Sequence, residues 1–122
     1  MAADWFVWFD KEGEKAPSKD DLGKALEDYL GAFAERVYWG MDRWFATLVG
    51  TKTWPFKRIV GPDHPLIEAH KAEESEERWI EVWRDSNCVD VMTRHGDWAT
   101  NTLAEGFAKL VAQYWKGRLD DG

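Results

Sequence analysis

Residues 78–84 read Arg-Trp-Ile-Glu-Val-Trp-Arg and residues 88–94 read Cys-Val-Asp-Val-Met-Thr-Arg, and these two segments decide the fold. Both are rich in β-branched and aromatic side chains, which favour strands. The Asp-Ser-Asn segment at 85–87 lies between them and is typical of a turn. The pattern predicts a β-hairpin, around which the rest of the chain can be arranged.

The side chains of this hairpin are expected to divide between two faces. Successive residues of a strand point to opposite sides, and a loop with an even number of residues places Val82 opposite Val91. An odd loop would bury Glu81 or Asp90 among aliphatic side chains, which is costly for an unpaired charge, so the even loop is expected. One face is then aliphatic and consists of Ile80, Val82, Val89 and Val91. The other face carries Trp79, Glu81, Trp83, Asp90, Met92 and Arg94.

A helix is expected to follow the hairpin and to cover its aliphatic face. Thr102 and Glu105 have the spacing of a capping box, so this helix is predicted to begin at Thr102. Gly117 is predicted to end it. Apolar residues recur every three or four positions and predict one buried stripe of Leu103, Phe107, Leu110, Val111, Tyr114 and Trp115.

The N-terminal half is expected to add strands and one more long helix. Residues 4–10 read as a strand that is apolar on both sides, which is typical of a strand covered on both faces. Ser18 can cap a helix whose apolar spacing continues to Val37. Further strands are predicted at 43–49 and 56–60, and a short exposed helix at 66–77.

This order of elements predicts the α+β class for the whole chain. We expect residues 1–122 to form a single domain, because a chain of 122 residues is too short for two ordinary domains. The expected architecture is a two-layer sandwich, in which an antiparallel sheet of about five strands carries the two long helices on one face. The order of helices and strands resembles that of small acidic secretion chaperones, immunity proteins and inhibitors. The resemblance rests on no residue motif, so it implies nothing about site residues.

Composition limits the classes of partner. The chain has 16 Lys and Arg against 23 Asp and Glu, a formal net charge of -7. This charge disfavours a nucleic-acid backbone or an anionic membrane as a partner and favours a basic one, although solubility alone also accounts for an acidic surface. The apolar run at residues 5–9 is too short for a signal segment or a membrane span. A single cysteine, Cys88, fits a reducing compartment, so a cytoplasmic location is expected.

The side chains that carry catalysis are present but poorly spaced for it. Candidate metal ligands are scattered at Asp63, His64, Glu68, His70, His95 and Asp97. They form no compact ligand motif, so neither a metal nor another cofactor is expected. Glu81 and Asp90 are the most credible acid pair, but Arg94 on the same face is expected to hold both ionised. An enzymatic role is therefore left open, with a non-enzymatic role favoured.

The leading functional hypothesis is a small acidic soluble protein that binds another macromolecule, as an inhibitor, immunity protein or chaperone does. Nine tryptophans in one small chain exceed what a single core needs. The expected binding residues are those of the polar and aromatic hairpin face, Trp79, Glu81, Trp83, Asp90, Met92 and Arg94. Large rings, Met and Arg are enriched in protein interfaces, so the expected partner is another protein.

Four other interpretations of the sequence remain open. Another segment could fold over the same hairpin face and bury it as a second small core. The same face could also join two copies of the chain in a homodimer. A small-ligand domain or modest enzyme could use a pocket lined by tryptophans, namely Trp44, Trp54, Trp79 and Trp83. An acidic mimic of DNA would rest on the Glu-rich run at 73–77.

Overall fold

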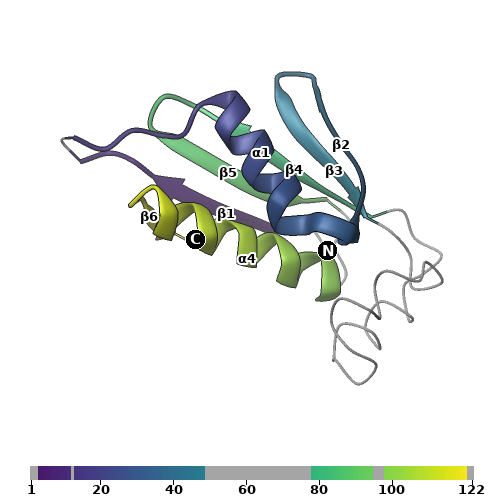
Figure 1. The fold of residues 1–122 in the computed structure, drawn as a ribbon. Coiled ribbons are helices and arrows are strands. Elements are labelled where there is room, and N and C mark those ends of the chain that lie inside the picture. The colour runs from purple at the N-terminus through teal and green to yellow at the C-terminus, as the bar shows by residue number, and fades with distance from the viewer. Residues whose placement is uncertain (1–2, 12, 49–77, 95–97, 121–122) are drawn as a thin grey trace.

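The computed structural model describes residues 3–11, 13–48, 78–94 and 98–120, which form a six-stranded sheet and two α-helices (Figure 1). The strands are β1 (Ala3–Trp8), β2 (Ala34–Gly40), β3 (Arg43–Leu48), β4 (Trp79–Arg84), β5 (Cys88–Thr93) and β6 (Arg118–Asp120). The helices are α1 (Lys19–Leu30) and α4 (Trp98–Tyr114), and a 3-10 turn, η1 (Gly31–Phe33), follows α1.

The strands are antiparallel throughout and lie in the order β2-β3-β4-β5-β1-β6. The predicted α+β class and antiparallel sheet are therefore confirmed, with six strands in place of about five. The strand predicted at 56–60 and the helix predicted at 66–77 lie outside the described residues.

The β4–β5 hairpin has the predicted register. Val82 lies opposite Val91, and the Asp85 amide donates a hydrogen bond of 2.8 Å to the Cys88 carbonyl, which closes a loop with an even number of residues. β1 then pairs with the other edge of β5 and places Val7 opposite Val89. The aliphatic face of the hairpin thus continues across β1.

Both helices lie on this aliphatic face (Figure 1). α1 reaches the sheet at Gly23, where an added Cβ atom would collide with the Trp44 ring, and the Trp44 indole Nε1 donates to the Lys19 carbonyl at 2.9 Å. α4 contacts α1 where the Tyr29 hydroxyl donates to the Leu103 carbonyl at 2.8 Å. The core between the layers includes Trp5, Val7, Leu22, Leu26, Ile80, Val82, Val89, Val91, Phe107 and Val111.

α1 begins as predicted and ends earlier than predicted. The Ser18 hydroxyl accepts the Asp21 amide at 3.2 Å, which is the expected N-cap. The extension of this helix to Val37 is wrong, because Gly31 takes a positive φ of 52° and its amide returns to the Glu27 carbonyl. Val37 consequently belongs to β2.

α4 differs from the prediction at both ends. It begins at Trp98, ahead of the proposed capping box at Thr102. Tyr114 does not belong to the buried stripe, because 73% of it is exposed, whereas Ala104 and Ala108 are fully buried. The apolar periodicity did not predict these two alanines, because small side chains contribute little to it. Their small size lets the helix lie close to the sheet.

Gly117 was predicted to end α4 as a left-handed glycine, but it has a different role. The left-handed residue at the helix end is Lys116, with a φ of 58°. A Cβ atom at Gly117 would lie 2.6 Å from Val7 Cγ1, so the glycine permits a close approach to β1. β6 follows directly and pairs with β1, and its three residues are too few to give a sequence pattern.

Candidate functional site

We call the side of the sheet opposite α1 and α4 the open face (Figure 1), and the strand register places the predicted binding residues on it. β4 supplies Trp79, Glu81 and Trp83, β5 supplies Asp90 and Met92, and Arg94 follows β5. The strand register adds side chains that the hairpin alone could not predict, namely Asp4, Phe6, Tyr38, Arg43 and Phe45. Within the described part of the chain, both helices lie on the other side of the sheet.

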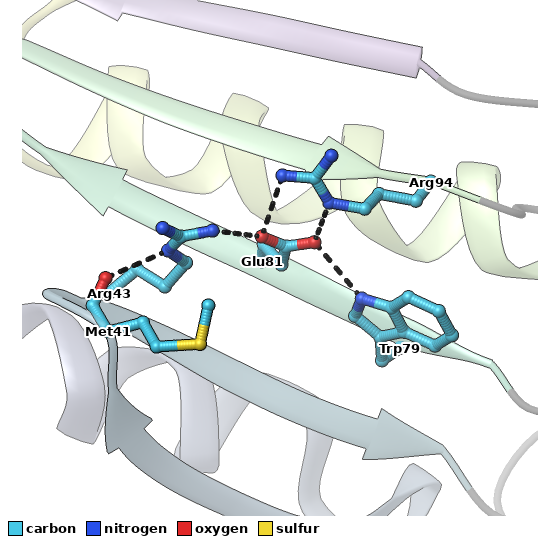
Figure 2. A network of polar contacts seen from close by, with 5 residues as sticks. All are labelled: Met41, Arg43, Trp79, Glu81 and Arg94. Atoms are coloured by element: carbon cyan, nitrogen blue, oxygen red, sulfur yellow. Dashed lines mark hydrogen bonds and ion pairs between the residues drawn. The ribbon is translucent and has the colours of Figure 1, made fainter.

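Glu81 is the centre of a polar network on the open face (Figure 2). Its side chain is only 1% exposed. Oε2 accepts hydrogen bonds from Arg94 Nε at 2.6 Å and Trp79 Nε1 at 3.1 Å, and Oε1 accepts one from Arg43 Nη1 at 3.0 Å. Burial raises the pKa of a carboxyl, but the bonds from Arg94, Trp79 and Arg43 outweigh it, so the pKa of Glu81 lies below its ordinary value.

Arg43 is a member of this network that the sequence interpretation missed. Its guanidinium carbon lies 3.3 Å from the centroid of the Trp83 ring, and Nε donates to the Met41 carbonyl at 3.1 Å. The side chain is 13% exposed, so the charge is largely removed from water between an aromatic ring and a carboxylate. The contact could have been predicted only from the register of β3 against β4. Phe45 pairs directly with Glu81, and Arg43, two residues before Phe45, therefore lies on the same face of the sheet.

Asp90 behaves differently from Glu81, although the sequence suggested that Arg94 would ionise both. Burial raises the pKa of Asp90 to about 7, and the charge of Asp4, a hydrogen bond with Asp4 and the charge of Glu81 act in the same direction. The prediction for Asp90 is therefore wrong. The neighbour of Asp90 is instead Asp4 in β1, which pairs with the edge of β5 that faces away from β4.

Two buried polar atoms of the open face have no hydrogen-bond partner. They are Asp90 Oδ1, an acceptor, and Trp83 Nε1, a donor. The two residues lie directly opposite each other in the β4–β5 ladder. An unsatisfied buried polar atom costs roughly 1–3 kcal/mol, so these two atoms are expected to lower the stability of the folded protein.

The Trp-lined pocket does not form as proposed. Trp44 pairs with Val82 and lies on the helix side of the sheet, whereas Trp79 and Trp83 lie on the open face. The fourth residue, Trp54, lies outside the described residues. The same holds for the Glu-rich run at 73–77 on which the DNA-mimic hypothesis rests.

The remaining chemical candidates give no reactive centre in the described ranges. Cys88 is buried, and burial together with the charges of Asp90 and Asp85 raises the pKa of its thiol to about 11. No group of three His, Cys, Asp or Glu side chains able to hold a metal occurs among the described residues. The histidines and acids considered as metal ligands, at positions 63, 64, 68, 70, 95 and 97, fall outside the described residues.

None of the helices in the described residues is long and apolar enough to cross a membrane. No protein-family model matches the chain, and neither a curated protein nor a solved structure is significantly similar to it. The functional argument therefore rests on the geometry of the open face and of the two helices.

Proposed function

We propose that the protein acts by binding another protein through the open face, as an inhibitor, an immunity protein or a small chaperone does. The observation that carries the proposal is the position of both helices on the opposite side of the sheet, which leaves a row of large side chains only half-buried. This row comprises Phe6, Trp8, Tyr38, Phe45, Trp79, Trp83 and Met92. Aromatic residues, Met and Arg supply most of the energy in protein interfaces.

The open face also has the rigidity that binding favours. Arg43 stacks on Trp83 and bonds Glu81, while Trp79 and Arg94 hold the same carboxylate. Side chains that are already ordered lose little conformational entropy when a partner docks. The network therefore supports a preformed surface.

The charge of this face argues against a strongly basic partner at this position. The strand register places four arginines and four acids on it, namely Arg36, Arg43, Arg94, Arg118, Asp4, Glu81, Asp90 and Asp120. They nearly cancel, so the excess acid of the chain lies elsewhere. The complementary partner surface is therefore apolar and close to neutral.

The partner can be identified by site-specific photo-crosslinking in the source cells. A photoreactive residue at Met92, on the open face, is expected to capture a discrete protein. The same residue at Lys109, an exposed position on α4, is the matched control and is expected not to capture it. Capture of a second copy of the chain, supported by light scattering, would replace the proposal with a homodimer.

The Trp83→Ala variant then tests the affinity of the identified complex. Loss of a central tryptophan typically weakens an interface by about 2 kcal/mol, or about 30-fold in Kd. Binding is measured by surface plasmon resonance, and a melting curve establishes that the variant is folded. Unchanged affinity in the folded variant would remove the open face as the docking surface.

A ligand screen by melting temperature tests the alternative of a small-ligand domain. A small-molecule site would respond to its ligand without any protein partner.

A further inference from the structure

A groove of about 620 Å³ lies between α1 and the C-terminal half of α4, in the layer of the molecule that faces away from the open side of the sheet. The two helices contact each other at Tyr29, whose hydroxyl would collide with a Cβ atom at Gly106. From there they diverge toward the N-terminal end of α1 (Figure 1). The groove lies where the two helices are further apart, and its volume falls in the range of binding sites for drug-sized ligands.

Five of the eight residues that line the groove are apolar or aromatic. α1 contributes Ala25 and Tyr29, and α4 contributes Leu110 and Tyr114, with Trp115 directly after the helix. The rings of Tyr114 and Trp115 meet edge to face, with centroids 4.8 Å apart and planes at 72°. Tyr114 is 73% exposed, which is high for so large a side chain. Aromatic faces of this kind attract cations.

The charge of the groove favours a cation as well. Asp21 and Asp28 line it, and Lys24 is the one basic residue among its described lining residues. Lys19, on the same helix, is directed elsewhere, since its ammonium lies 4.5 Å from the Trp39 ring centroid. The last turn of α4 carries no basic side chain, and the nearest basic residue along the chain is Lys116, two residues past the end of the helix.

We propose that this groove binds an arginine or lysine side chain carried by a peptide segment of a partner protein. The cationic group lies against the rings of Tyr114 and Trp115 and forms charge-assisted hydrogen bonds with Asp21 and Asp28. The aliphatic stem and the flanking peptide cover Ala25 and Leu110. This site is separate from the open face and does not rest on the proposed function.

A pair of peptides that differ only in charge tests the proposal. The probe is the capped tripeptide Gly-Arg-Gly, and the control replaces arginine with citrulline, which has nearly the same shape without the charge. Titration of the ¹⁵N-labelled protein is expected to give saturable NMR shifts at Ala25, Leu110 and the Trp115 indole. The arginine peptide is expected to bind about tenfold more tightly than the citrulline peptide, because it alone offers the cation–π and ionic contacts. Equal affinities, or no saturation, would overturn the proposal.

Two variants with matched controls separate a site from general attraction to an acidic protein. Asp28→Asn is expected to weaken the arginine peptide by about three- to fivefold, as for an exposed ion pair, while Glu27→Gln makes the same charge change outside the groove and is expected to leave affinity unaltered. Tyr114→Ala is expected to weaken binding of the arginine peptide by a similar factor without any change of charge. Met41→Ala, which removes another exposed apolar side chain, is the control. If Glu27→Gln weakens binding as much as Asp28→Asn, or if Tyr114→Ala has no effect, the cation is attracted only by net charge and the proposal fails.

Discussion

At the scale of single residues, Glu81 should contribute to stability as well as to the open face. Glu81→Gln keeps the shape of the side chain but leaves the largely buried Arg43 guanidinium without its counter-charge. Breaking a buried ion pair costs about 3–5 kcal/mol, and we expect about 2 kcal/mol in this case because Arg94 is 48% exposed. Urea unfolding measures the difference, with Glu35→Gln, an exposed residue of β2, as the control. A variant as stable as the wild type would show that desolvation of the ions cancels their attraction.

At the scale of elements, the seating of α1 on the sheet depends on Gly23. Alanine favours a helix over glycine by about 1 kcal/mol, so propensity alone predicts that Gly23→Ala stabilises the protein. We expect the opposite, a loss of about 1–3 kcal/mol, because the added Cβ collides with the Trp44 ring. Thermal unfolding measures it, and Gly40→Ala is the control, since its Cβ would be 3.8 Å from the Tyr38 ring. A stabilised Gly23→Ala variant would mean that α1 shifts freely on the sheet.

Element ends show where sequence patterns lose their value. Apolar spacing continued past Leu30 and predicted more helix, although Gly31 ends α1 and the next residues form β2. A pattern of three or four residues fits one helical turn or one short strand equally well, so the choice is made by the strand that pairs with it. In this protein, pairing with β3 makes residues 34–40 the strand β2.

At the scale of the whole molecule, stability should depend on pH through two acids with opposite shifts. The folded-state pKa of Asp90 is raised to about 7, so its contribution to stability is greatest when the group is protonated and declines as the pH rises from about 4 to 7. The pKa of Glu81 is lowered, so its contribution is lost as the pH falls below the ordinary value of 4.5. Thermal unfolding across the pH range is therefore expected to show maximal stability in mildly acidic solution.

Asp90→Asn identifies the origin of the decline toward neutral pH. Asparagine cannot ionise, so the variant is expected to be more stable than the wild type at pH 8 and similar to it below about pH 4, where Asp90 is protonated in the folded and the unfolded protein. The control Glu35→Gln removes a charge from an exposed position and is expected to leave the pH profile unchanged in shape. If the decline persists in Asp90→Asn, repulsion spread over the chain of net charge -7 is its cause.

The sequence alone determined the hairpin, its two faces, the starting cap of α1 and part of the buried stripe of α4. These features depend on side-chain alternation, turn chemistry and capping, which act between residues close together in the chain. Only the tertiary structure decided which side chains meet on the open face. Arg43 reaches Glu81 from a position 38 residues away, and Asp4, near the N-terminus, is hydrogen-bonded to Asp90 in β5. Such pairs depend on strand order, which follows from burial over the whole sheet and leaves no local pattern.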